Sequence, residues 1–373
     1  MLDRPALFSP LTRSLPATIP FVGPEALERQ TGAAFKARLG ANESVFGPSP
    51  KVIAAMAEAA AQSWAYGDPE QFALKAALAA HHGLKPENFA VGEGIDGLLG
   101  HLVHLATEAG DGVLSSHGAY PTFNYHVAAR GAVLDLVPYR DERPAIYQDI
   151  DALLERARET RPKLLYFANP DNPTGSLHSS ARIEQLIAET PEETILILDE
   201  AYGDMAPKGA MPPEDLIRPN LLRFRTFSKA YGMAGVRVGY VIGAPESVRQ
   251  FDKVRNHFGV SRMAQAGALA ALGDQEYLRE TVATIAAART RLAGIATAAG
   301  LVPLTSATNF VAIDCGRDTA FAKAILAEVL KEGVFIRMPG IAPLDRMIRV
   351  SVGREEDLDL FEAALGVALR KVG

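Results

Sequence analysis

The sequence predicts an α/β protein, with a mostly parallel central sheet that carries helices on both faces and a smaller α+β domain beside it. In the middle of the chain, short apolar runs alternate with helix-like stretches at a spacing of about 20–30 residues, which is typical of βαβ units. After about residue 246 the pattern changes to long helical stretches, then short strand candidates and a final helix from Glu355. This change of pattern predicts the second domain.

The strands follow one another along the chain at the apolar runs. Those of the central sheet are expected at residues 88–91, 112–115, 132–138, 163–168, 194–199, 221–227 and 236–242. Those of the smaller domain are expected at residues 309–315, 333–339 and 347–353. Alanine-rich runs punctuated by charges predict amphipathic helices between them. We expect a large domain of residues 42–250, and a small domain of residues 1–41 together with 251–373.

Composition excludes several classes of protein. The chain has 373 residues, 48% of them hydrophobic, and a net charge of −6, so bulk disorder is excluded and nucleic-acid binding is disfavoured. The single cysteine, Cys315, excludes an internal disulfide and a cysteine-rich metal site. No uncharged apolar run reaches the roughly 18 residues that a transmembrane helix needs, and no targeting segment is visible. We therefore expect a cytoplasmic protein without a metal centre.

Unusual residues gather where the expected strands end, and ligands of open α/β sheets bind at the carboxyl ends of strands. Asp199 ends the apolar run TILILD, and Lys229 follows the strand at residues 221–227. A buried carboxylate could face a cationic ligand group, and a desolvated lysine could serve as an imine-forming nucleophile. Taken alone, Asp199 fits a turn or helix cap as well, and Lys229 fits a snorkelling side chain.

Two further segments add to this edge of the sheet. Asn169 to Gly175 reads NPDNPTG, a rigid turn with two prolines and a glycine. Ser228 and Arg237 offer hydrogen-bond donors for a phosphate, and the glycines around them allow close backbone approach. The segment VGEGIDG also fits the dinucleotide pattern G-x-G-x-x-G, but the acidic partner expected at the end of the second strand is missing. A phosphate-binding turn for a smaller cofactor explains these glycines.

With these motifs together, the chain resembles fold-type I, pyridoxal-phosphate-dependent aminotransferases of class I/II, and among them the histidinol-phosphate aminotransferase branch. The motifs that carry the resemblance are ANESVFGP (41–48), WAYGDPE (64–70), VGEGIDGLL (91–99), YPTF (120–123), ANPDNPTG (168–175), LDEAY (198–202), TFSKAYGMAGVRVGY (226–240) and MIRVSVG (347–353). They span nearly the whole chain. The set is specific for the superfamily and much less so for the substrate.

The resemblance implies the activity and the partners. The cofactor would be pyridoxal 5'-phosphate. The enzyme would move an amino group from an α-amino acid or L-histidinol phosphate to a 2-oxo acid (2-oxoglutarate or pyruvate) by a ping-pong Schiff-base mechanism. The protein would be a homodimer with shared active sites. Alternatives on the same scaffold are an amino-acid decarboxylase or lyase, and an aromatic amino-acid aminotransferase. A cofactor-sensing regulator would need a DNA-binding extension, and we expect none because no basic helix-turn-helix pattern is visible.

The resemblance also assigns roles at the cofactor ring. Lys229 would hold the cofactor and act as the acid and base of the proton shift. Asp199 would pair with the pyridine nitrogen and keep it protonated, which makes the ring an electron sink. Asn172 and Tyr202 would hydrogen-bond the phenolic oxygen. Phe123 would stack on the ring, where many relatives have tyrosine.

Other residues would bind the cofactor phosphate and the substrate. The phosphate would lie at the first turn of a helix, a natural anion site, against Gly94, Ile95, Asp96, Thr226, Ser228 and Arg237. Tyr66 would reach the phosphate of the neighbouring subunit. Arg349 would grip the substrate α-carboxylate, because the arginine fork suits bidentate binding. Arg337 would lie near the distal group of the substrate, although a surface arginine at a strand end explains it too.

The identity of the amino donor stays open at the level of the sequence. Histidinol-phosphate enzymes often carry a tyrosine in a Y-V-P-G segment, and the equivalent residues 19–24 here read IPFVGP. Glu93 replaces the usual arginine or asparagine, and residues 255–261 lack the usual proline-rich run. These departures weaken the case for a phosphorylated substrate and leave room for aromatic or other neutral donors.

Overall fold

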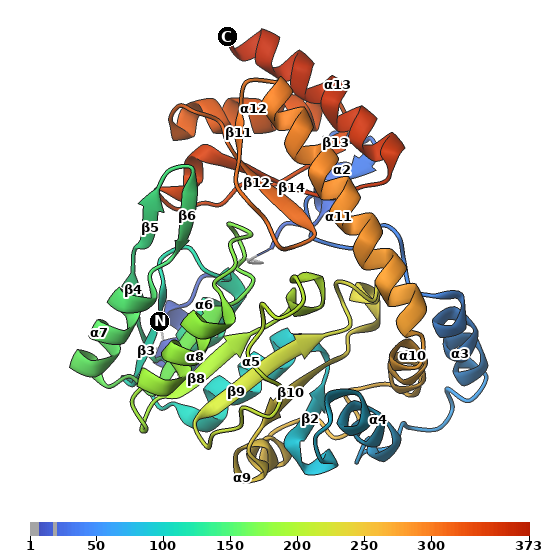
Figure 1. The fold of residues 1–373 in the computed structure, drawn as a ribbon, viewed down its shortest axis with the longest axis vertical. Coiled ribbons are helices and arrows are strands. Elements are labelled where there is room, and N and C mark those ends of the chain that lie inside the picture. Colours follow the sequence, from blue (N-terminus) through green and yellow to red (C-terminus); the bar gives the residue numbers. More distant parts are fainter. Residues whose placement is uncertain (1–6, 18–20) are drawn as a thin grey trace, which may run out of the picture.

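A twisted sheet with strand order β2-β10-β9-β8-β7-β3-β4 forms the base of the larger part of the molecule (Figure 1). The computed structural model describes residues 7–17 and 21–373. The strands are β2 (Phe89–Gly92), β3 (Gly112–Ser116), β4 (Val133–Val137), β7 (Leu164–Ala168), β8 (Ile195–Asp199), β9 (Leu221–Thr226) and β10 (Gly239–Gly243). Only β10 runs antiparallel to its neighbours in this sheet, so the prediction of a mostly parallel sheet is confirmed.

Helices cover both faces of the sheet, as the sequence predicts. One face packs on α5 (Gly94–Ala106), α6 (Pro121–Arg130) and α9 (Pro245–Val248). The other packs on α7 (Ile150–Thr160), α8 (Ser180–Glu189), α3 (Pro50–Ala60), α4 (Phe72–His82) and α10 (Arg262–Leu272). Strand residues alternate between the two hydrophobic clusters because successive side chains point to opposite faces.

Strand β9 departs from this apolar pattern on one face. Leu222 and Phe224 point into the cluster under α5, whereas Arg223 and Arg225 lie on the opposite face and are almost fully buried. Their shared buried partner is Glu200, which follows β8 and accepts hydrogen bonds from Arg223 Nε (3.1 Å) and Arg225 Nε (2.8 Å). The partly exposed Glu214 also pairs with both arginines. The two cations are thereby neutralised in part, as buried charges require.

The smaller part sits above the carboxyl ends of the parallel strands (Figure 1). Its strands are β11 (Val302–Pro303), β12 (Phe310–Asp314) and β14 (Met347–Ser351), with β1 (Ala37–Arg38) paired to β13 (Val334–Phe335). Its helices are α2 (Pro24–Thr31), α11 (Gln275–Ala298), α12 (Thr319–Lys331) and α13 (Glu355–Val372). The parallel pairing of β1 with β13 joins the N-terminal segment to the C-terminal one.

An antiparallel hairpin of β5 (Tyr139–Glu142) and β6 (Ala145–Gln148) rises from the large part and packs against the small one. The sequence did not predict it, because its strands are short and bear charges. A short helix α1 (Pro10–Ser14) precedes α2. 3₁₀ turns lie at Pro86–Asn88, Gly203–Met205, Ala234–Val236, Arg249–Lys253 and Leu344–Arg346.

The limits of the two domains stay a prediction. The packing of α10 concerns the limit expected at residue 250. This helix lies beyond that residue, but it contacts α3 and α4 and shares their hydrophobic cluster with strands β2 and β10 of the central sheet. Within the described residues, no helix is both long and apolar enough to cross a bilayer. The same residues contain no group of histidine, cysteine or acidic side chains arranged to hold a metal ion.

The buried cluster on β9 makes a prediction about stability. Replacing Glu200 by alanine removes the buried acid that both arginines share and leaves them only the partly exposed Glu214, which lies 3.8 Å from Arg223 and 2.9 Å from Arg225. We expect the free energy of unfolding to fall by about 3–5 kcal/mol. Urea denaturation measures this. The control is Arg158→Ala, which breaks an exposed pair with Glu189 and should cost less than about 1 kcal/mol. Equal, small losses in the two variants would contradict the assignment of Glu200 as the required counter-ion.

Candidate active site

The loops that follow β7, β8 and β9 meet at one edge of the sheet, beneath the smaller part (Figure 1). The register pairs Ala168 with Asp199, and Asp199 with Phe224. The segment from Asn169 to Gly175 therefore starts beside Asp199, and the loop with Lys229 starts close to it on the other side. Because neighbouring parallel strands end at the same edge, three motifs that are far apart in sequence become neighbours.

Asp199 lies at the floor of this site and is 6% exposed. Its Oδ2 accepts a hydrogen bond from Tyr166 Oη at 2.6 Å, and its Oδ1 accepts one from Ala201 N at 3.0 Å. Burial raises the pKa of the Asp199 carboxyl, and these hydrogen bonds partly oppose the rise. A cationic group placed opposite would keep this carboxylate ionised.

Lys229 brings an amine into the same site. Its Nζ donates a hydrogen bond to the carbonyl oxygen of Asn42 at 3.0 Å and lies 5.7 Å from the centre of the Tyr202 ring. Burial, together with the neighbouring cations Arg349 and Arg237, lowers the pKa of Lys229 to about 8. A lysine with this pKa has a substantial uncharged fraction near neutral pH, which is the nucleophilic form.

Asn42 links the amine to the smaller part and was not singled out from the sequence. Its Nδ2 donates to Tyr202 Oη at 3.0 Å, and its backbone N donates to Ser351 Oγ at 3.0 Å. Its carbonyl also accepts from Asn309 Nδ2 at 3.0 Å. Asn42 adopts a left-handed backbone conformation with φ of 54°, which asparagine tolerates better than most residues. Its position within ANES was the available signal.

Arg349 reaches the site from β14 of the smaller part. Its Nη1 donates to Asn172 Oδ1 at 2.5 Å, so the NPDNPTG loop and the small part meet directly. Burial lowers the pKa of the Arg349 guanidinium to about 10, and its Nε has no partner among the described residues. A partly buried cation with a free donor is suited to bind an incoming carboxylate.

Arg337 lies beside Arg349, because a short antiparallel bridge joins their backbones. Its guanidinium lies 4.0 Å from the centre of the Phe21 ring and donates to the Val22 carbonyl at 3.1 Å. Burial lowers its pKa, and no acidic side chain of the described residues pairs with it. Ile19 and Pro20, from the segment that lacks the expected tyrosine, fall outside the described residues.

A cradle for an anion forms where β2 leads into α5. Gly94 has φ of +84°, and a Cβ built on it would run into the Arg237 guanidinium. A Cβ on Gly239 would meet the backbone N of Ile95 at 3.0 Å. These glycines keep open the space around the free N–H groups of the first helical turn, which includes Ile95 and Asp96.

Hydroxyl groups and a cation complete the cradle. Thr226 Oγ1 donates to Ser228 Oγ at 2.9 Å, and Arg237 Nη1 lies 3.5 Å from the same oxygen. The donor set of backbone N–H, hydroxyl and guanidinium groups is suited to a phosphate. The residues that the sequence assigned to a phosphate within one chain are therefore brought together.

The aromatic residue assigned to the ring needs correction. Phe123 is fully buried, and its ring stacks on Tyr166 at 4.6 Å, so neither face is open to a ligand. Tyr120, three positions earlier in YPTF, faces the site instead. Burial raises its pKa to about 12, helped by the Asp96 and Asp199 carboxylates. The YPTF pattern does not show where α6 begins, and the start of this helix turns Phe123 into the core.

Tyr66 is not brought to this group within one chain. It is 76% exposed, and its ring packs on Phe258 at 4.6 Å. The residues that do come together are Lys229, Asp199, Tyr202, Asn172, Arg349, Arg337, Thr226, Ser228, Arg237, Gly94, Ile95 and Asp96, with Asn42 and Tyr120 added by the structure.

This fold and this site are those of an aminotransferase. Residues 36–365 match the family model of aminotransferase class I and II. The match covers most of the chain, and the chain belongs to this family. The resemblance stated from the sequence motifs is thereby confirmed.

Individual relatives carry more specific names. A histidinol-phosphate aminotransferase from Anaeromyxobacter sp. is 34% identical over 363 residues, which are 96% of this chain and 98% of that protein. The crystal structure of histidinol-phosphate aminotransferase from Sinorhizobium meliloti, in complex with pyridoxal-5'-phosphate, is 51% identical with a TM-score of 0.95 and full coverage of both chains. Aspartate aminotransferase from Thermus thermophilus with maleate has a TM-score of 0.77, 24% identity and coverage of 92% and 94%, and shares the fold.

The lowered pKa of Lys229 can be measured on the cofactor-free protein. Its amine should react with trinitrobenzenesulfonate with a midpoint near pH 8, because the uncharged form is present there. Peptide mapping across a pH series identifies the modified lysine, and Lys229→Ala should lack the early-reacting class. A midpoint near the ordinary lysine value of 10.5 would contradict the desolvated site.

Proposed function

We propose that the chain is a pyridoxal-phosphate-dependent aminotransferase that moves an amino group from L-histidinol phosphate or an α-amino acid to 2-oxoglutarate or pyruvate. The observation that carries the proposal is the partly buried amine of Lys229, with its lowered pKa, in the same site as the buried carboxylate of Asp199. Family membership and the names of the relatives support it, and they favour it over a decarboxylase or an aromatic aminotransferase.

The residues of the site fit this cofactor. The cradle at the start of α5, with Thr226, Ser228 and Arg237, would hold its phosphate. Asp199 would hold the ring nitrogen in its protonated form, and Tyr120 would lie against the ring. When bound, pyridoxal phosphate withdraws electrons from the carbon that carries the amino group.

The protein side chains would perform the binding and the proton movements. Lys229 would attach the cofactor through Nζ and, once displaced, carry the proton at that atom, since its pKa of about 8 suits an acid and a base near neutral pH. Tyr202 and Asn172 would orient the phenolic oxygen. Arg349 would fix the carboxylate of the amino acid or the 2-oxo acid. The carbonyl of Asn42 would hold the free amine in place between these steps.

The paired arginines support a phosphorylated donor. L-histidinol phosphate carries a phosphate ester where an amino acid has its carboxylate, so its negative charge lies further from the reacting carbon. Arg337 and Arg349 lie side by side, because an antiparallel bridge pairs their backbones. Arg337 has no acidic partner among the described residues. Two adjacent cations suit a dianionic group better than a single carboxylate.

The substrate assignment is tested with Arg337→Gln in a coupled assay with 2-oxoglutarate. We expect kcat/KM for L-histidinol phosphate to fall about 100-fold, because a charge pair to the phosphate is lost, and kcat/KM for L-phenylalanine to change less than about 3-fold.

Arg317→Gln is the matched control. Its guanidinium also lies over a phenylalanine ring, that of Phe321, but on the surface of the small part, and neither donor should be affected. Failure of the wild-type enzyme to aminate 2-oxoglutarate from L-histidinol phosphate would contradict this substrate. Carbon dioxide release without an acceptor would favour the decarboxylase.

We also propose that the enzyme is a homodimer in the cytoplasm. Apolar side chains are exposed on α3, on α10, at the first residue of α4 and on the segments that join α3 to α4 and lead into α10. These side chains, which we call the apolar patch, are Ile53, Trp64, Tyr66, Phe72, Phe258, Met263 and Leu269. A patch of this kind on one surface is typical of an interface. In such a dimer Tyr66 would reach the phosphate cradle of the neighbouring subunit. The single cysteine, Cys315, is buried and fits a reducing compartment.

A charge placed on the patch tests the dimer. Ile53→Asp places one unpaired carboxylate from each subunit in the interface of a two-fold dimer. We therefore expect a mainly monomeric protein at micromolar concentration with little activity. Val133→Asp is the control, because Val133 is exposed to the same degree (56% against 55%) but lies on the edge strand β4. Sedimentation measures the outcome. A dimeric and active Ile53→Asp enzyme would contradict the proposed interface.

A further inference from the structure

A buried carboxylate, that of Asp171, lies in the loop that carries Asn172, and the proposed reaction does not use it. Asp171 is 1% exposed. Its Oδ2 accepts hydrogen bonds from Thr174 Oγ1 (2.6 Å) and Thr174 N (3.1 Å), which close the NPDNPTG turn. Its Oδ1 accepts from Tyr139 Oη at 3.0 Å, and Tyr139 belongs to a different element, strand β5. The two oxygens therefore tie the loop to itself and to the hairpin.

The same hairpin also contacts the small part. Tyr139 and Ile146 pack in a hydrophobic cluster with Leu344 and Met347, among others. Met347 is the first residue of β14, the strand that carries Arg349. The loop with Asn172 and the strand with Arg349 thus contact one hairpin, and they meet each other in the bond from Arg349 to Asn172. Tyr139 is the residue that takes part in both attachments.

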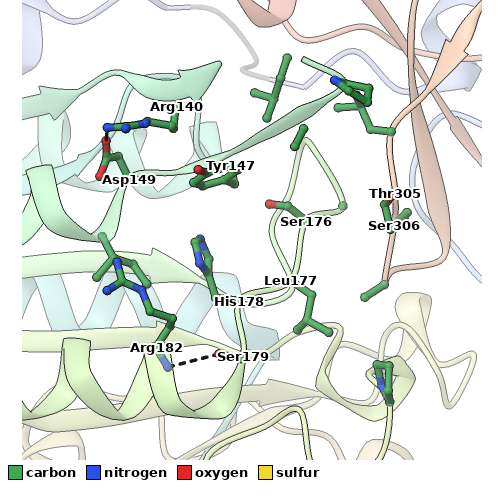
Figure 2. A pocket seen from close by; sticks show the side chains of 18 of the residues that line it. Arg140, Tyr147, Asp149, Ser176, Leu177, His178, Ser179, Arg182, Thr305 and Ser306 are labelled. Carbon is green, nitrogen blue, oxygen red and sulfur yellow. Dashed lines mark hydrogen bonds and ion pairs between the residues drawn. The ribbon is translucent and has the colours of Figure 1, made fainter. Parts of the chain in front are cut away.

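The junction between the two parts is hollow beside this hairpin. A cavity of about 720 Å³ is lined by the hairpin, by residues 175–179 and Arg182, and by residues 303–307 of the small part. Figure 2 shows Tyr147 and Ser176 on one side of this space, with Thr305 and Ser306 across from them. Because side chains do not fill this space, the relative placement of the loop and the small part depends strongly on the direct ties at its rim. The bond from Ala307 N to Gly175 O (2.8 Å) joins the loop to the small part directly. The bond from Tyr139 to Asp171 joins the loop to the hairpin, which in turn packs on the small part.

We propose that Asp171 is a positioning residue that, through its bond to Tyr139, holds Asn172 in register with Arg349 and so sets the affinity of the site for carboxylates. The proposal rests on the proposed function in one respect, the binding of substrate carboxylates by Arg349. Asp171 touches neither cofactor nor substrate in this role. Its effect passes through Asn172, the next residue in the chain.

The ionisation of Asp171 is consistent with this role. Burial raises its pKa to about 6, while the hydrogen bonds from Thr174 and Tyr139 lower it and the Asp199 carboxylate raises it. At neutral pH the ionised form prevails, and it accepts all of these hydrogen bonds. Removal of the Tyr139 hydroxyl leaves one buried carboxylate oxygen without its donor, which weakens the attachment of the loop to the hairpin.

The test uses Tyr139→Phe, which removes only the hydroxyl. We expect the KM for 2-oxoglutarate to rise about tenfold and kcat to change less than about 3-fold, because carboxylate binding is loosened while Lys229 and Asp199 keep their surroundings. Tyr147→Phe is the matched control on the same hairpin, since its hydroxyl donates to the exposed Glu142, and both constants should stay unchanged. Thermal unfolding of both variants confirms that they are folded.

A binding measurement separates this proposal from the proposed function. Glutarate, which lacks the reactive carbonyl, is titrated calorimetrically into the cofactor-loaded proteins, and its Kd should weaken about tenfold in Tyr139→Phe only. An inactive wild type that still shows this difference would overturn the proposed function and support the positioning role. Equal glutarate affinity in wild type and Tyr139→Phe, or no glutarate binding at all, would overturn the positioning role.

A double-mutant cycle with Asn172→Ala excludes a general loosening of the hairpin. If Tyr139 acts through Asn172, Tyr139→Phe should change the Kd for glutarate less than about twofold once Asn172 is already removed. If the two effects multiply instead, Tyr139 acts independently of Asn172 and the proposal is overturned.

Discussion

The site depends on one electrostatic constraint: an amine and a carboxylate, those of Lys229 and Asp199, are both withdrawn from water at the same edge of the sheet. Burial disfavours the charged form of each, lowering one pKa and raising the other. Neither group forms an ion pair with the other in the described structure, so each remains available to a ligand. A cofactor with a carbonyl group at one end and a basic ring nitrogen at the other satisfies both groups at once.

The sequence predicted the central sheet well because its strands are continuous apolar runs that end in distinctive turns. The runs before Asp199 and Lys229 are examples, and the parallel arrangement places their ends together without further information. The hairpin that carries Tyr139 could not be predicted, since it is short, charged and stabilised by contacts with residues near Leu344 that are distant in sequence. Contacts of that kind are set by tertiary packing and leave no periodic pattern.

Site residues could be predicted where a motif fixes the backbone. They were harder to predict where the start of a helix determines whether a side chain points into the core or into the site. The NPDNPTG loop places Asn172 in the site, where it accepts a hydrogen bond from Arg349. Within YPTF, the start of α6 decides which aromatic ring enters the core: it buries Phe123, which was expected on the cofactor ring, and leaves Tyr120 partly exposed. Asn42 was missed because its role comes from contacts across two parts of the chain that the sequence separates by more than a hundred residues.

Covalent trapping tests the central claim most directly. The purified protein is incubated with pyridoxal 5'-phosphate, reduced with borohydride and digested, and the modified peptide is identified by mass spectrometry. The account predicts a phosphopyridoxyl group on Lys229 in near-stoichiometric amount. Labelling scattered over exposed lysines, or none on the peptide that contains Lys229, would contradict it.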